Sequence, residues 1–132
     1  MTINAAHLIL YVADQQRSTE FYSRVLELKP RLNVPGMTEF EIGQFTVLGL
    51  MPYTSVERLF DIDRSKLESG DKPKAELYLL VDEPDAYHQR ALDHGAKELS
   101  SIKDRDWGHV AAYSIDKDGN VIAFASPITG AA

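Results

Sequence analysis

The sequence predicts an α+β protein made of two copies of one strand–helix–three-strand unit. The first observation is a repeated apolar strand, because residues 7–12 (HLILYV) match residues 76–81 (ELYLLV). The second is that an acidic residue, a helix-forming segment and three short strands follow each copy. Pro52 and Pro127 then close the two copies. One such unit alone exposes a face of its small sheet, so we expect the two units to bury these faces together.

The first copy begins with a buried strand at residues 7–12. Asp14 is placed to cap the helix that follows, and Lys29-Pro30 is placed to stop it, because proline disfavours helical geometry in the preceding residue. Turns that contain glycine or proline then separate three short strands. We expect these strands at residues 31–34, 37–42 and 45–51.

The second copy repeats this order. Residues 76–81 form its first strand, Pro84 suits the first turn of its helix, and Gly95 is placed to end that helix. Asp118-Gly119 is a strong hairpin-turn signal between the last two strands. The three strands after the helix are expected at residues 97–102, 109–115 and 120–126.

Residues 53–74 fall outside the repeat and are expected to form a linker or flap. A helical turn at residues 56–60 is predicted there, before a polar stretch. The predicted organisation is therefore one domain over residues 1–132. Its module one covers about residues 6–52, and its module two covers about residues 75–127.

Composition limits the classes of partner. The net charge is −6 and the basic residues are scattered, which disfavours nucleic acid and anionic membrane surfaces. The chain has no cysteine, which excludes disulfides, thiolate metal sites and cysteine nucleophiles. No apolar run approaches the roughly 20 residues that cross a bilayer, and the N-terminus lacks a signal-peptide pattern. We therefore expect a cytoplasmic protein.

Strand alternation assigns side chains to faces. His7 and Tyr11 share one face of the first strand, and Glu76 and Tyr78 share the corresponding face of the repeated strand. The opposite faces are aliphatic and are the expected seats of the helices. The polar faces are therefore expected to look into a cleft between the copies, where polar groups need hydrogen-bond partners, water or a ligand.

The last strands of the two copies are expected to add an apolar wall to this cleft. Small and aliphatic side chains suit an organic ligand held by burial, and an ordinary packed core is an equal alternative. The residues expected in this wall are Thr46, Leu48, Leu50, Val121, Ala123 and Ala125.

Trp107 lies in the loop between the sixth and seventh predicted strands. It is expected either at the rim of a pocket, where planar compounds stack, or packed within its loop. His109 is a candidate third metal ligand or base, and alternation does not fix its face. Tyr11, Tyr78 and Tyr113 are candidate hydrogen-bonding groups that could equally belong to the core.

Other polar side chains have simpler interpretations. His88 and His94 lie on the second predicted helix and are expected at the surface. Glu39 and Glu41 share a strand face that is expected to be solvated, with a paired-carboxylate site as the alternative. Arg105 is expected to pair with the adjacent aspartate or to brace its loop.

Three segments, HLILYVAD, STEFYSRVLEL and SIDKDGNVIAF, carry a resemblance to the vicinal-oxygen-chelate superfamily. That superfamily includes glyoxalases, bleomycin-resistance proteins and extradiol dioxygenases. The resemblance implies a single glyoxalase-like domain of two βαβββ modules in tandem, with curved mixed sheets enclosing a cleft. It also implies a homodimer, because dimers are common in the superfamily.

Enzymes that this chain resembles bind a divalent metal through one ligand from the first strand and one from the last strand of each module. His7 and Glu76 match the two first-strand positions. Alignment of the repeats places Leu48 and Ala123 at the last-strand positions, and neither side chain binds a metal. We therefore expect no cofactor, with a divalent metal on His7 and Glu76 as the alternative. The other interpretations are a hydrogen-bonded His7–Glu76 pair and a polar anchor or base for a bound ligand.

The resemblance and the residues together favour a small-molecule-binding protein that sequesters an organic ligand without a metal. The acidic net charge suits a cationic compound. The alternatives are a metal-dependent glyoxalase-like lyase or isomerase with an atypical ligand set, whose catalytic residues are unknown, and a small assembly module. The expected ligand-binding residues are His7, Tyr11, Leu48, Glu76, Tyr78, Trp107 and Ala123.

Overall fold

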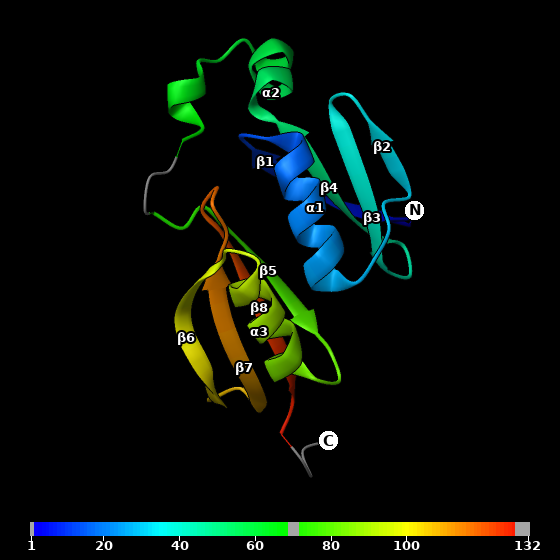
Figure 1. The fold of residues 1–132 in the computed structure, drawn as a ribbon. Helices are drawn as coiled ribbons and strands as arrows, with labels where there is room; N and C mark the ends of the chain where they lie inside the picture. The colour runs from blue at the N-terminus through cyan, green and yellow to red at the C-terminus, as the bar shows by residue number, and fades with distance from the viewer. Residues whose placement is uncertain (1, 69–71, 129–132) are drawn as a thin grey trace. The chain divides into compact units, whose positions relative to one another are not determined.

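The structure, a computed structural model, describes residues 2–68 and 72–128, and its internal contacts divide the chain into two compact units, Met1–Glu68 and Ser69–Ala132. Each unit has the order strand, helix, three strands, so the fold is α+β with two βαβββ modules in tandem, as predicted (Figure 1). Residues 69–71 of the predicted linker, and residues 1 and 129–132 of the predicted domain, lie outside the described residues. No helix in the described ranges is long and apolar enough to cross a membrane.

The sheet of the first unit has the strand order β1-β4-β3-β2, in which β1 and β4 are parallel and the other pairs antiparallel. The Asp14 side chain caps α1 by accepting from the Arg17 backbone N–H at 3.0 Å, and Glu27 ends the helix in the left-handed conformation. The elements are β1 (Ala6–Val12), α1 (Gln15–Leu26), β2 (Leu32–Val34), β3 (Met37–Gly43), β4 (Thr46–Pro52), α2 (Tyr53–Phe60) and the 3₁₀ turn η1 (Arg64–Lys66). Helix α2 therefore begins directly after β4, earlier than the predicted helical turn.

Helix α1 packs on one face of this sheet (Figure 1). The Thr19 hydroxyl of α1 and the Thr38 hydroxyl of β3 are 2.8 Å apart. Thr38 is paired with Leu50, and Leu50 is paired with Leu10, so these three side chains point toward α1. Leu10 and Leu50 are buried, and this face is the core of the first unit.

The sheet of the second unit has the equivalent order β5-β8-β7-β6, with β5 and β8 parallel. Pro84 opens its helix and Gly95, with φ +108, follows the end of it, as predicted. The hairpin at Asp118-Gly119 is closed by the Asp116 carboxylate, which accepts from two backbone N–H groups of the turn at 2.9 Å each. The elements are β5 (Ala75–Leu80), α3 (Pro84–Asp93), β6 (Lys97–Asp104), β7 (His109–Ile115) and β8 (Asn120–Pro127).

The core of the second unit lies between this sheet and α3. Phe124 of β8 is fully buried, and its ring lies 5.2 Å from the ring of Tyr87 on α3, measured between centroids. Leu79 and Ala112 are the neighbours of Phe124 in the ladder and share its face. The side chains next to them along each strand therefore point to the face opposite α3.

His88 belongs to this core, so the prediction that it lies at the surface is wrong. It is 5% exposed, and its Nε2 lies 2.8 Å from Glu98 Oε2 on β6. Its position on α3, three residues before the buried Ala91, places it on the inward face of the helix. His94, at the end of the helix, is exposed as predicted.

Candidate functional site

The pairing of β1 with β4 decides which side chains share a face with His7. Partners across a ladder point to the same face. His7 is paired with Val47, whereas Leu48 is paired with Leu8 on the α1 side of the sheet. Leu48 is fully buried there, and the prediction that it lies on the His7 face is wrong. The same correction applies to two other residues of the predicted wall, Thr46 and Leu50.

The second unit shows where the alignment of the repeats failed. Tyr78 is paired with Ala123 in the same way that Ile9 is paired with Gly49. Gly49 is therefore the counterpart of Ala123, in place of Leu48. Because side chains alternate with a period of two, a slip of one residue moves a side chain to the opposite face of the sheet.

On the face opposite α1, His7 lies beside the Glu39 carboxylate of its own unit. Its Nδ1 is 3.6 Å from Glu39 Oε2, and Arg31 Nε donates to Glu39 Oε1 at 3.0 Å. Arg31 Nη1 also lies 3.6 Å from Glu41 Oε1. The Glu39 side chain is 15% exposed, so the prediction of a solvated position holds for Glu41 and is wrong for Glu39. In this group of four side chains, the Arg31 guanidinium lies beside two carboxylates, and His7 lies beside one of them.

The face opposite α3 carries three hydrogen-bonded aromatic side chains, Tyr78, Trp107 and His109, which we call the aromatic cluster. Trp107 Nε1 donates to Tyr78 Oη at 2.8 Å, and Tyr78 Oη lies 2.7 Å from His109 Nδ1. The rings of Tyr78 and His109 stack with centroids 5.8 Å apart. An indole N–H only donates, so the Tyr78 oxygen accepts from Trp107. Which of Tyr78 Oη and His109 Nδ1 donates to the other depends on the His109 tautomer. The Trp107 side of the cluster is open, since this residue is 55% exposed.

Tyr113 extends the aromatic cluster along β7. It is paired with Ala123 and therefore shares the face of Tyr78. The Arg105 guanidinium lies 5.1 Å from the Tyr113 ring centroid and donates to the Ala111 carbonyl at 2.8 Å. Further Arg105 bonds go to Ser100 Oγ at 3.0 Å and the Ser101 carbonyl at 2.9 Å. Arg105 is thus a brace of its loop, one of its two predicted roles.

The pKa of the Tyr113 phenol reflects the charges around it on this face. Burial raises the pKa of its phenol above the usual 10.0, the negative charge of Glu76 and the Tyr78 phenol raise it further, and Arg105 lowers it. We expect the Glu76→Gln variant to lower this pKa, because a negative charge that opposes phenolate formation is gone. Ultraviolet titration of phenolate absorbance measures it, with Tyr113→Phe to assign the transition. Glu83→Gln serves as the control variant. A Glu76→Gln variant that leaves the Tyr113 pKa unchanged, or lowers it no more than Glu83→Gln does, would contradict this assignment.

The donors present do not fit the divalent metal that the superfamily implies. Gly49 and Ala123, on the last strands, offer no side-chain ligand, and the Glu39 carboxylate beside His7 is already bonded to Arg31. Within residues 2–68 and 72–128, no group of three or more His, Cys, Asp or Glu side chains is arranged to hold a metal ion. Structural and catalytic zinc sites use at least three protein ligands, and the described residues gather no such set.

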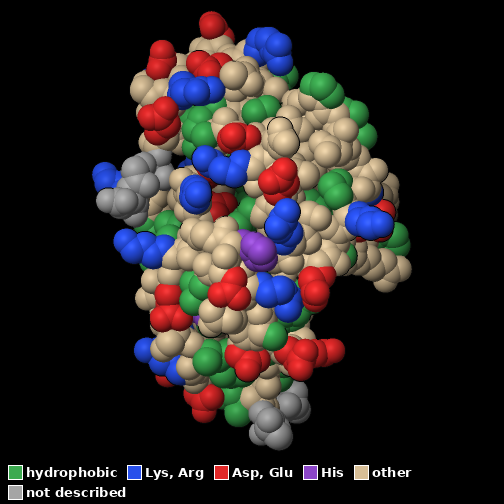
Figure 2. Space-filling view, in the orientation of Figure 1, with side chains coloured by type: hydrophobic (Ala, Val, Ile, Leu, Met, Phe, Trp, Pro, Cys, Tyr) green, Lys and Arg blue, Asp and Glu red, His purple; other side chains and the backbone are tan. Residues whose placement is uncertain are grey.

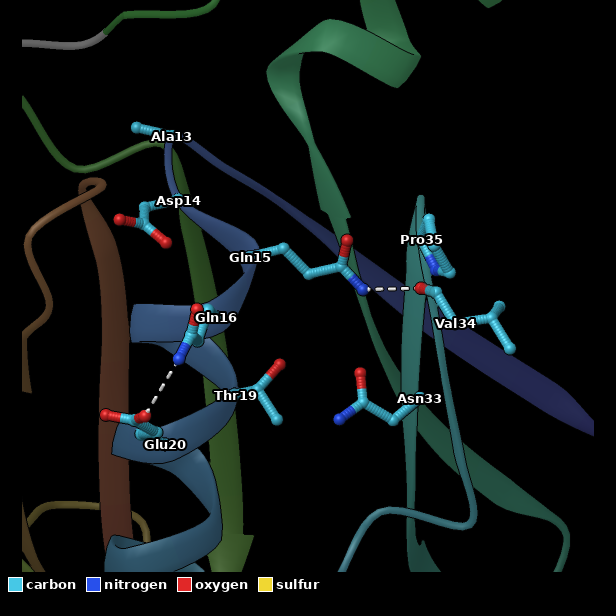
Figure 3. A pocket seen from close by; sticks show the side chains of 9 residues that line it. All are labelled: Ala13, Asp14, Gln15, Gln16, Thr19, Glu20, Asn33, Val34 and Pro35. Carbon is cyan, nitrogen blue, oxygen red and sulfur yellow. Dashed lines mark hydrogen bonds between the residues drawn. The ribbon is translucent and has the colours of Figure 1, made fainter.

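A polar pocket of about 820 Å³ lies beside the first turn of α1 and β2 (Figure 3). The Gln15 side chain reaches across it, donates to the Val34 carbonyl at 2.8 Å and accepts from the Gly36 N–H at 2.9 Å. Gln16 and Glu20 are bonded to each other along the helix. Gln15 therefore fastens α1 to the turn after β2. None of the seven predicted ligand-binding residues is among the described residues that line this pocket.

The structure brings together some of the predicted site residues. Tyr78 and Trp107 are in contact, and Ala123 shares the sheet face of Tyr78 by register. Residues His7 and Glu76 belong to different units, so their pairing stays a prediction. The face of His109 follows from strand alternation, because it lies four residues before Tyr113 on β7. The pairing of Arg31 with Glu39 has no comparable signal, because it depends on the register of β2 against β3.

The surface carries charges of both signs. Figure 2 shows Lys and Arg side chains interspersed with Asp and Glu side chains over the described residues in view. On the face in view, no broad patch of one sign of charge is therefore present among the described residues.

Two consecutive βαβββ units define this chain as a protein of the tandem-module α+β class. The family model of the Glyoxalase/Bleomycin resistance protein/Dioxygenase superfamily matches residues 4–124. The chain belongs to this superfamily. The comparison with curated proteins gave no match.

Solved structures share the fold. A glyoxalase/bleomycin resistance protein/dioxygenase from Nocardioides has a TM-score of 0.76 at 20% identity, covering 98% of this chain and 86% of its own. A glyoxalase-related enzyme from Fulvimarina pelagi has a TM-score of 0.77 at 19% identity, with coverages of 92% and 86%. A family enzyme from Burkholderia phytofirmans has a TM-score of 0.77 at 16% identity, with coverages of 92% and 97%. At these identities the similarity concerns the fold, which hosts many functions.

Proposed function

We propose that this protein binds and sequesters a small organic molecule without a metal, as a binding protein of the glyoxalase/bleomycin-resistance type. The observation that carries the proposal is the aromatic cluster. Trp107 is more than half exposed, yet its N–H is bonded to Tyr78. A ring that is held in place but open to solvent is available for stacking on a planar ligand.

The cluster has the features of a preorganised binding surface. Tyr78 is fixed from two sides, by Trp107 and by His109, so little side-chain freedom is lost when a ligand binds. Ala123 and Ala125 share the sheet face of Tyr78 and are fully buried, so the open part of the cluster is the Trp107 ring. Glu76, exposed on that face, supports a ligand that carries positive charge. Sequestration requires fit and burial, and no reactive group.

Fluorescence of Trp107, the single tryptophan of the chain, tests this proposal. We expect a planar aromatic amine from a panel of antibiotics and metabolites to change Trp107 emission and to raise the melting temperature, with no effect of a chelator. Tyr78→Phe should weaken that binding about fivefold, because it removes the hydroxyl that orients both neighbours. Tyr87→Phe, the same change on the α3 side of the sheet, is the matched control and should leave the affinity unchanged.

Two results would reject the proposal. One is a panel in which no amine, carboxylate or neutral ring compound changes either signal. The other is binding that requires added Ni, Zn or Mn and is lost in His7→Ala. The second result would instead favour the metal-dependent lyase or isomerase, and turnover of a glutathione hemithioacetal would then be measured.

A further inference from the structure

The first unit contains an apolar pocket between one end of its sheet and α2. Its volume is about 460 Å³, within the range of small-molecule sites. Met37 at the start of β3, Met51 near the end of β4 and Leu59 on α2 supply its apolar walls. Because Tyr11 is paired with Met51, the pocket continues the sheet face on which His7 lies.

The two methionines form the sheet side of this pocket. Thr38 is paired with Leu50, which brings Met37 and Met51 opposite each other on the other face of the same strands. Unbranched thioether side chains adapt to the shape of a bound group. On the helix side, Leu59 is 62% exposed, so an apolar ligand that covers it removes apolar surface from water.

Gly36, in the turn between β2 and β3, places no side chain in the space between this turn and α2. A Cβ atom at this position would lie 3.2 Å from Ser55 Oγ on α2, and the φ of +97 is one that other residues rarely adopt. The backbone at Gly36 and the side chain of Ser55 therefore both line the pocket.

Arg58 is the charged side chain among the described residues that line the pocket. It lies in the last turn of α2, exposed, and no hydrogen bond or ion pair engages its guanidinium within residues 2–68 and 72–128. A planar guanidinium matches a carboxylate through two parallel N–H···O bonds. The pocket thus combines an adaptable apolar wall with one available cation at its edge.

We propose that the first unit binds a small apolar carboxylate in this pocket. Its hydrocarbon part lies against Met37, Met51 and Leu59, and its carboxylate is bound by Arg58. This site is assigned from the first unit alone, so it does not depend on the ligand proposed for the aromatic cluster.

The test uses three probes with one carbon skeleton: 3-phenylpropionate, 3-phenylpropanol and 3-phenylpropylamine. The full chain is labelled with ¹³C at methionine methyl groups, and the signals of Met37 and Met51 are assigned by single leucine substitutions. At low salt, the acid should shift both signals and bind about threefold to fivefold more tightly than the alcohol, and the amine should bind least tightly. Arg58→Gln should reduce the affinity for the acid to the affinity for the alcohol. Arg24→Gln, an exposed arginine in the last turn of α1, is the matched control.

Three outcomes would overturn the proposal. The acid and the alcohol bind equally in the unaltered protein, or Arg24→Gln weakens the acid as much as Arg58→Gln does. Alternatively, the Met37 and Met51 signals change with protein concentration before any probe is added, which would mean that a second copy covers the pocket. Trp107 emission is recorded in the same samples, so failure here is distinguishable from failure of the aromatic cluster to bind its ligand.

Discussion

Replacing Phe124 by alanine is expected to lower the free energy of unfolding by about 3–5 kcal/mol. Phe124 is fully buried, lies in the central part of β8 and packs against the Tyr87 ring of α3. Its removal leaves a cavity that its ladder neighbour Ala112 is too small to fill. Part of the loss is the transfer free energy of the ring, and part is the unfilled space. Urea unfolding followed by circular dichroism and Trp107 fluorescence measures the change.

A matched control separates burial from the change of residue type. Phe60→Ala makes the same substitution at a position on α2 that is 57% exposed, and it should alter stability by no more than about 0.5 kcal/mol. Equal losses at the two positions would contradict the placement of Phe124 in the core. So would a Phe124→Ala protein that keeps the stability of the unaltered chain.

Local chemistry made much of the fold predictable from the sequence. A side-chain oxygen at Asp14, the fixed φ of Pro84 and the conformational freedom of Gly95 each act over a few residues, and each ends or begins a helix where expected. The repeated apolar strand then gave the order of elements in both units. These signals do not depend on how distant segments pair, so they predict the order of elements within each module.

Register and helix orientation were harder to predict. The face of Leu48 depends on the pairing of β1 with β4, which places it opposite Leu8. Those two strands are far apart in the sequence, and an error of one residue in aligning the repeats moves the side chain to the other face. His88 is a polar residue, and the signal for its inward position is Ala91 one turn later on the same helix face, which is also buried. The environment of Glu39 includes Arg31, which lies just before β2, so alternation within β3 alone does not predict it.

Replacing Leu48 by alanine is expected to lower the free energy of unfolding by about 2–5 kcal/mol, because its side chain lies in the core beneath α1. Leu8, its partner on β1, points to the same face but is 37% exposed. Leu8→Ala is therefore the matched control and should cost less than about 1.5 kcal/mol. Urea unfolding of both variants, followed by circular dichroism, measures the two losses. A Leu48→Ala variant that loses no more than Leu8→Ala would contradict the burial of this side chain.

The face of Leu48 can be tested separately from its burial. Phe40 is paired with Leu48 across β3 and β4, so the two side chains share the α1 face, whereas Met51 points to the other face of β4. Leu48→Ala and Phe40→Leu should be coupled by about 0.5–3 kcal/mol in a double-mutant cycle, while Leu48→Ala and Met51→Ala should add within about 0.5 kcal/mol. If Leu48 were coupled to Met51 and not to Phe40, its side chain would lie on the same face as His7. The corrected register would then fail, and with it the conclusion that Gly49 is the counterpart of Ala123.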